Sequence, residues 1–204
     1  MILILDYDMG NIASIKNMLH SIGYDDVLIS GDPSDIEKAD KIILPGVGAF
    51  DTGMRNLHER GLVEPLRHAA KEGGKPVLGI CLGMQLLGLD SEEGSSEGLS
   101  LIPFHTVRFN LDENYKVPHM GWNDVRQEKD DCKLTQYLTD EPARFYFVHS
   151  YHAVCDNDEN SLMTAEYGYR FTAAVCRGNI YGVQFHPEKS HKFGKALMKG
   201  YVGL

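Results

Sequence analysis

The hydrophobic residues in the first half of the chain gather in short runs, and helical patterns separate these runs. Four runs rich in Leu, Ile and Val are typical of buried strands, and they span residues 2–5, 27–29, 41–44 and 77–80. Helices are predicted after the first run, where four apolar residues share one face (Ile12, Ile15, Leu19 and Ile22), and over residues 82–89. This alternation indicates parallel strands with helices on both faces of the sheet.

The second half of the chain is dominated by strand-like segments, which span residues 99–109, 145–148, 162–167, 171–176 and 180–185. A final helix is predicted over residues 192–201. We therefore predict one α/β domain over residues 1–204. Its open mixed sheet is parallel at the centre, has helices on both faces and carries an antiparallel extension.

Composition and charge narrow the classes of function. The 204 residues suit a single domain, and the net charge of −9 argues against binding to nucleic acid or to anionic membranes. The longest uncharged stretch, residues 76–89, has 14 residues, whereas a bilayer span needs about 20. No secretory signal is recognised at the N-terminus. The four cysteines form no CxxC pair, so we expect a reducing, cytoplasmic setting.

Cys81 is the first candidate for chemistry, because it follows a predicted buried strand within the pattern Gly79-Ile80-Cys81-Leu82-Gly83. A G-x-C-x-G sequence is the thiol version of a nucleophile elbow, in which two glycines allow a sharp strand-to-helix turn. In open sheets, reactive groups lie beyond the carboxyl ends of the strands, as Cys81 does here. The alternative is an ordinary buried core cysteine.

His186 and Glu188 supply the partners that a thiol nucleophile needs. They occur in Gln184-Phe185-His186-Pro187-Glu188, just after another predicted strand. If the segment is extended, both side chains point to one side, so the carboxylate orients the imidazole and the imidazole serves as base. Pro187 disfavours helical geometry at His186. The alternative for any one histidine is a surface or core residue without a catalytic role.

A glycine-rich turn, Pro45-Gly46-Val47-Gly48-Ala49-Phe50, follows a third predicted strand. Its exposed backbone N–H groups, at Val47 and Gly48, are candidates to form an oxyanion hole with the N–H of Leu82. A plain loop and a phosphate-binding turn are the alternatives. The spacing matches neither the P-loop nor the dinucleotide-binding pattern, which weakens the nucleotide interpretation.

Taken together, these motifs resemble the class I (triad) glutamine amidotransferases, in the same order and over nearly the whole chain. The resemblance implies a flavodoxin-like fold, L-glutamine as substrate and no cofactor. It assigns Cys81 as the nucleophile that forms a γ-glutamyl thioester, His186 as the general base and acid, and Glu188 as its orienting partner.

The same resemblance implies the residues that hold glutamine. Gln85 and Glu93 match substrate-binding positions, and Glu93 suits the α-ammonium group by charge, although a solvated loop carboxylate is the alternative. Backbone groups at His149, Ser150 and Tyr151 would receive the substrate carboxylate. One departure is His152, where the family more often has an aromatic residue.

Within the class, further segments are similar to the glutaminases that pass ammonia to a (β/α)₈-barrel cyclase of histidine biosynthesis. These segments are residues 8–11, 45–50, 118–123 and 147–151. A chain of 204 residues has no room for a barrel of about 250, so we expect the cyclase to be a separate chain in a heterodimer. Candidate interface residues are Asn11, Trp122 and Lys189. Core packing of Trp122 and a solvated Lys189 are the alternatives.

Other functions remain open on the sequence. The chain could serve a different acceptor enzyme, of the anthranilate, aminodeoxychorismate or carbamoyl phosphate type. A peptidase of similar fold would not need Gln85, and a non-enzymatic glutamine-sensing module would not need the triad. A metal site is the weakest alternative, because its candidate ligands His149, His152, His186 and His191 have no recognisable ligand spacing.

Overall fold

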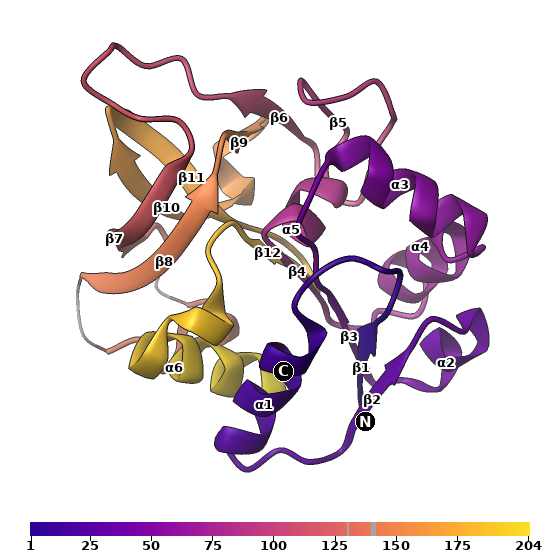
Figure 1. Cartoon of the computed structure of the whole chain (residues 1–204). Coiled ribbons are helices and arrows are strands. Elements are labelled where there is room, and N and C mark those ends of the chain that lie inside the picture. The colour runs from indigo at the N-terminus through magenta and orange to yellow at the C-terminus, as the bar shows by residue number, and fades with distance from the viewer. Residues whose placement is uncertain (130, 140–141) are drawn as a thin grey trace.

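A mixed twelve-stranded sheet forms the centre of the molecule, and the computed structural model describes residues 1–129, 131–139 and 142–204 of the chain (Figure 1). Five strands at one end of the sheet are parallel, and their spatial order is β2 (Val27–Ser30), β1 (Ile2–Leu5), β3 (Lys41–Leu44), β4 (Val77–Ile80) and β12 (Ile180–Val183). The predicted parallel part of the sheet is therefore confirmed.

The antiparallel strands continue from β12 and form the predicted extension. Their order is β11 (Tyr169–Arg177), β10 (Ser161–Tyr167), β7 (His119–Gln127) and β8 (Ala143–His149). A short branch adds β9 (Tyr151–Cys155), which pairs with β11 and with β6 (Phe104–Arg108), and β6 also pairs with β5 (Asp90–Ser91).

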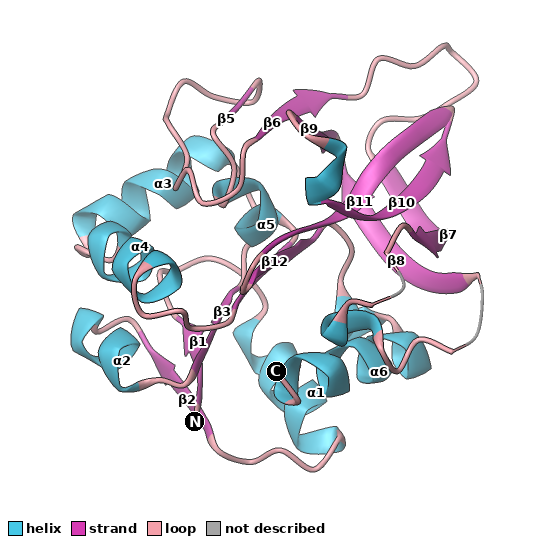
Figure 2. Ribbon diagram, turned by 180° about the vertical axis from the view of Figure 1, so that it is seen from behind, coloured by secondary structure: helices cyan, strands magenta, loops and turns pink. Residues whose placement is uncertain are grey.

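Helices cover both faces of the parallel strands (Figures 1 and 2). One face carries α1 (Ile12–Ser21) and α6 (His191–Val202), and the other carries α2 (Pro33–Lys38), α3 (Phe50–Glu59), α4 (Val63–Lys71) and α5 (Leu82–Leu86). The described residues also form 3₁₀ turns, which are η1 (Lys133–Thr135), η2 (Asp158–Asn160) and η3 (Pro187–Lys189). No helix in the described part of the chain is long and apolar enough to cross a membrane.

Two hydrophobic cores lie on opposite sides of this sheet, because side chains alternate along each strand. In β1, Ile2 and Ile4 pack into the core beneath α1 and α6, whereas Leu3 and Leu5 pack into the core beneath α2, α3 and α4. All four side chains are fully buried, which explains the continuous apolar run in the sequence.

Several sequence predictions need correction. Residues 99–103 are not a strand, because the N–H groups of residues 99–102 bond to carbonyls of residues 86–88 instead of to a neighbouring strand; for example, Leu99 N donates to Leu86 O at 2.8 Å. The helix predicted over residues 82–89 ends at Leu86. The sequence prediction also lacked α2, α3, α4, β7 and β9. The final helix, predicted over residues 192–201, is confirmed as α6.

An aromatic cluster centred on Phe109 forms the core of the antiparallel half. Six rings have centroids within 6.3 Å of the Phe109 ring: His119, His149, His152, Tyr167, Tyr169 and Phe171. His119 Nδ1 and His149 Nε2 lie 2.9 Å apart, and His149 Nδ1 lies 2.7 Å from Tyr151 O. Asn123 Nδ2 can only donate and lies 3.3 Å from His119 Nε2, so that nitrogen carries no proton and His119 donates from Nδ1. His149 therefore accepts at Nε2 and donates from Nδ1 to Tyr151 O, and both rings are neutral.

Burial of these two histidines opposes their protonation. It lowers the pKa of His119 to about 4 and, against the hydrogen bond to Tyr151 O, that of His149 to about 3. In the unfolded chain both titrate near 6.5. Between these values the unfolded chain binds more protons than the folded protein does, so the folded state loses stability as the pH falls.

We therefore expect the free energy of unfolding to fall between pH 6 and pH 5 by about 1 kcal/mol for each histidine. Urea unfolding at pH 7, 6 and 5 measures this dependence. His119→Gln removes one titrating ring and keeps an amide donor, so its stability should depend less steeply on pH than that of the wild type. Parallel curves for the two proteins would contradict the assignment.

Candidate active site

Cys81 lies in a sharp turn between β4 and α5. Its backbone has φ 55° and ψ −112°, a positive-φ conformation that costs a non-glycine residue on the order of 1–3 kcal/mol. Gly83 permits the turn, because a Cβ there would lie 1.9 Å from Leu44 O. Gly79 is equally constrained, since its Cβ would lie 2.5 Å from Gly83 O. This is the geometry that the G-x-C-x-G pattern predicts.

His186 and Glu188 form a buried pair beyond the end of β12. The His186 ring donates from Nδ1 to Glu188 Oε1 at 2.8 Å, and each side chain is only 2% exposed. His186 is extended, with φ −102° and ψ 97°, as the following proline predicts. The extended segment predicted through Glu188 is wrong, because Lys189 N donates to His186 O at 3.1 Å and closes a 3₁₀ turn. Pro187 fits the first position of that turn.

Opposing effects act on the pKa of His186. Burial lowers it, but the interactions with the Cys81 sulfur and the Glu188 carboxylate outweigh burial and raise the pKa to about 9. Nε2 of His186 makes no hydrogen bond to the part of the protein that the structure describes, and the residue lines the same cavity as Cys81. At neutral pH a protonated imidazole therefore faces the space around the sulfur.

One cavity of about 310 Å³ brings together most of the residues predicted from the sequence. It contains the catalytic candidates Cys81 and His186, with Glu188 behind the imidazole. The residues predicted for the oxyanion hole and for substrate binding also line it: Val47, Gly48, Leu82, Gln85, Glu93, His149, Ser150 and Tyr151. The cavity thus brings a thiol and an imidazole together, with a carboxylate hydrogen-bonded to the imidazole.

In this conformation Leu82 N–H, predicted as one donor of the oxyanion hole, has a partner within the protein. Leu82 N–H donates to Gly46 O at 3.3 Å, so a carbonyl of the glycine-rich turn occupies the donor expected to face an oxyanion. The start of the turn is fixed, since the buried Tyr7 hydroxyl donates to Pro45 O. Val47 beyond it is exposed, and Gly48 has φ 117°.

Two predicted substrate-binding side chains already have protein partners. Glu93 Oε2 accepts from Phe50 N at 2.9 Å and so satisfies an N–H at the start of α3. Gln85 Nε2 donates to Gln184 Oε1 at 3.0 Å. Both residues still line the cavity.

The sequence argument did not assign roles to Gln184 and Ser190. Gln184 is fully buried and its Nε2 lies 3.7 Å from the Cys81 sulfur, so it joins Gln85 to the nucleophile. Ser190 Oγ donates to His186 O at 2.6 Å and accepts from Tyr146 N at 3.0 Å, which ties the base to β8. A glutamine within the strand predicted over residues 180–185, which ends at Val183 in the structure, was the available signal, because buried amides need partners.

The predicted interface residues lie on the surface. Trp122 is 45% exposed, so the alternative of core packing is wrong, and its ring stacks on His191 at 5.4 Å between centroids. Lys189 Nζ lies 5.4 Å from the Tyr146 ring, which also meets the edge of Trp122. Asn11 is exposed just before α1, which packs against η3.

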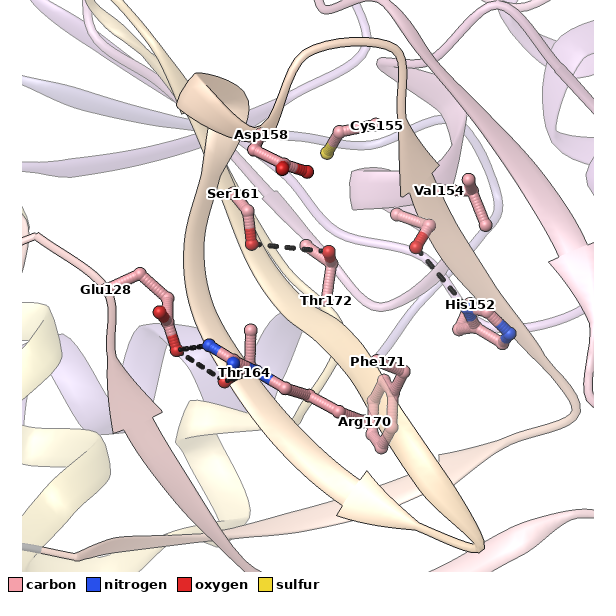
Figure 3. Close-up of a pocket in the computed structure, with 11 residues that line it drawn as sticks. Glu128, His152, Val154, Cys155, Asp158, Ser161, Thr164, Arg170, Phe171 and Thr172 are labelled. Atoms are coloured by element: carbon pink, nitrogen blue, oxygen red, sulfur yellow. Dashed lines mark hydrogen bonds and ion pairs between the residues drawn. The ribbon is translucent and has the colours of Figure 1, made fainter.

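His152 lies outside the active-site cavity. It packs in the aromatic cluster, with Nε2 2.9 Å from Tyr169 Oη, and it lines a second cavity of about 410 Å³ beside β9, β10 and β11 (Figure 3). Among the described residues, no group of three or more His, Cys, Asp or Glu side chains could hold a metal ion. The sequence departure at His152 therefore places no side chain in the cavity around Cys81.

Known proteins resemble this chain over its full length. The model of the family "Glutamine amidotransferase class-I" matches residues 3–200. A relative from Methanococcus maripaludis, named imidazole glycerol phosphate synthase subunit HisH 2, is 54% identical over 99% of this chain and 98% of its own length. A relative of the same name from Pseudomonas aeruginosa is 50% identical over the whole of both chains.

Solved structures share the fold at lower sequence identity. A chain of PurLQS from Thermotoga maritima has a TM-score of 0.78 at 21% identity, over 99% of this chain and 97% of its own. A structure described as a glutamine amidotransferase has a TM-score of 0.72 at 18% identity, over 99% of this chain and 97% of its own. The chain belongs to the class-I glutamine amidotransferase family, and within it shares close sequence similarity with the HisH subunits of imidazole glycerol phosphate synthase.

Proposed function

We propose that this protein hydrolyses L-glutamine to glutamate and ammonia through a cysteine thioester. The observation that carries the proposal is the meeting of Cys81, in a positive-φ elbow, with the buried His186–Glu188 pair at one cavity. A thiol, a base and an orienting carboxylate are the three groups that nucleophilic acyl transfer requires.

The reaction begins when the Cys81 sulfur attacks the side-chain amide carbon of glutamine, its proton having passed to His186 Nε2. The imidazolium then donates that proton to the departing nitrogen, so ammonia leaves and a γ-glutamyl thioester remains. His186 next takes a proton from water, whose oxygen attacks the thioester and releases glutamate. The raised pKa of His186 suits the acid step, because the ring holds its proton at neutral pH.

Chemistry also suggests how glutamine is oriented. The carboxylate of Glu93 would attract the α-ammonium group, while backbone groups at His149, Ser150 and Tyr151 would receive the α-carboxylate. Gln85 would form a hydrogen bond with the substrate from the wall of the cavity that α5 provides. These residues support the proposal because they lie around Cys81 in the same cavity.

The orientation of the glycine-rich turn, residues 45–50, would control the rate of glutamine hydrolysis. Leu82 N–H is engaged by Gly46 O, so an oxyanion formed at Cys81 would meet no free donor from this residue. Rotation of the Gly46–Val47 peptide would move that carbonyl away and bring Val47 N–H toward the cavity. Glycine at position 46 makes such a rotation inexpensive, and we propose that the partner subunit favours it when the partner holds its own substrate.

We further propose that the ammonia passes to a separate (β/α)₈-barrel cyclase, in a cytoplasmic heterodimer that makes imidazole glycerol phosphate and AICAR in histidine biosynthesis. The names of the relatives support this partner. The exposed Trp122, with Lys189 and Asn11 nearby, offers a docking face with an aromatic anchor. All four cysteines are free thiols, in keeping with a reducing compartment.

Cys81→Ala in the reconstituted pair should abolish product formation from glutamine, because no thioester can form. Synthesis from added ammonium should survive, because the acceptor chemistry resides in the other subunit. The measurement is product formation with each nitrogen source. Loss of both activities in a variant that still binds its partner, or glutamine hydrolysis that persists without the thiol, would contradict the proposal. Assembly with an anthranilate-type or aminodeoxychorismate-type subunit instead would identify a different acceptor.

Val47→Pro should lower partner-stimulated glutamine hydrolysis about 10²–10³-fold, because proline lacks the N–H that would stabilise the oxyanion. Val47→Ala is the matched control, since it shortens the side chain and keeps the N–H. Steady-state kinetics of the assembled pair should show the loss mainly in kcat. Equal activity of the two variants would rule out an oxyanion role for Val47 N–H.

A further inference from the structure

A second cluster of reactive side chains lies at the end of β11 and β12 that is remote from the active site. It consists of Cys176, Lys129 and Cys132. Cys176 pairs with Tyr181 near the start of β12, whereas His186 follows that strand at its other end. Lys129 follows β7, and Cys132 immediately precedes η1. The Lys129 ammonium lies 3.5 Å from the Cys176 sulfur and also donates to Glu159 O, so a backbone carbonyl holds it in place.

The surroundings of Cys176 differ from those of the neighbouring Cys155. In Figure 3 the Cys155 sulfur lies beside the Asp158 carboxylate. Burial raises the pKa of Cys155 to about 11, against a hydrogen bond with Thr172 and with help from such negative charges. Hydrogen bonding from the Cys132 thiol, together with the Lys129 ammonium, outweighs burial and lowers the pKa of Cys176 to about 6. The proton stays on Cys132, whose pKa is raised by the same hydrogen bond and by burial.

We propose that Cys176 and Cys132 form a peroxide-reactive thiol pair, in which Lys129 activates Cys176 and Cys132 closes a reversible disulfide. Both cysteines are partly exposed, so a small oxidant can reach them. The hydrogen bond between the two thiols brings the second next to the first, and both act on Tyr181, which pairs with Cys176 across β11 and β12. None of the three residues lines the cavity around Cys81, so the pair is separate from the glutaminase chemistry.

The chemistry needs only a hydroperoxide as oxidant. The Cys176 thiolate attacks one peroxide oxygen, the O–O bond breaks, and a sulfenic acid and hydroxide form when the oxidant is hydrogen peroxide. The Cys132 sulfur then attacks the sulfenic sulfur. An S–S bond forms, the S–O bond breaks, and the oxygen leaves as water with the thiol proton. The two sulfurs lose two electrons in total, and one peroxide is reduced.

The disulfide would join β11 to the segment before η1. That segment supports α6, since a Cβ at Gly200 would lie only 2.0 Å from Leu134 O. Oxidation would therefore cross-link the sheet to the layer that holds the C-terminal helix. If the two thiols only packed together, Cys176 would not be alkylated faster than Cys155. The rate of its alkylation would also not depend on the charge of Lys129.

The test uses the full chain with Cys81→Ser, so that the active-site thiol cannot react. Iodoacetamide at pH 7 should label Cys176 at least about tenfold faster than Cys155, as peptide mass spectrometry would quantify. Hydrogen peroxide should yield a Cys132–Cys176 linked peptide that dithiothreitol reverses. Lys129→Met should slow labelling of Cys176 at pH 6.5 several-fold, and Lys129→Arg, which keeps the positive charge, should restore it.

Two results would overturn the proposal. One is labelling of Cys155 as fast as Cys176, and the other is peroxide oxidation of Cys176 that proceeds to sulfinic acid without a bond to Cys132. Equal labelling of the Lys129→Met and Lys129→Arg proteins would remove the activating role of the ammonium. Melting temperatures of all variants show whether they fold. The comparison of Cys176 with Cys155 labelling uses the Cys81→Ser protein, in which Lys129, Cys132 and Cys176 are unchanged, so it does not depend on the folding of any Lys129 variant.

Discussion

The parallel pairing of β4 with β12 is the contact on which the active site depends. Ile80 lies opposite Val183, and Cys81 N donates to Val183 O at 2.8 Å, so the residues that follow both strands emerge at one edge of the sheet. Gln184 lies 103 positions from Cys81 in sequence, yet its amide reaches the sulfur. Both strands are buried along their whole length, and this burial fixes the register because a slip of one residue would reverse every side chain.

The sequence predicts the parallel strands well because burial on both faces leaves a continuous apolar run. It fails where apolar residues are buried outside regular structure: Leu99, Leu101 and Ile102 are core residues, but their N–H groups bond to carbonyls of residues 86 and 87. It also fails for β7, where exposed and half-buried positions include Asn123 and Asp124, so no alternating pattern stands out. Intrinsic strand propensity predicts secondary structure poorly where contacts with the rest of the fold determine it.

The candidate site was more predictable than the fold around it. Cys81, His186 and Glu188 carry side chains whose chemistry is visible in the sequence, and glycines mark the turn that aims the nucleophile. The orientation of a backbone peptide cannot be predicted in this way, since no residue type shows which way the Gly46–Val47 peptide faces. The same holds for Glu188, which reaches His186 from a 3₁₀ turn and not along an extended segment. A correct pairing was thus predicted for an incorrect local reason.

The main chain of His186 is bonded to β8, since His186 N donates to Tyr146 O at 2.9 Å and Ser190 bridges the same two residues. The sulfur, by contrast, belongs to β4. The Tyr146 ring meets both Trp122 and Lys189 on the outer surface. A protein bound over Trp122 would therefore act on the strand to which the His186 main chain is bonded, and a shift of that strand would change the distance between the imidazole and the Cys81 sulfur.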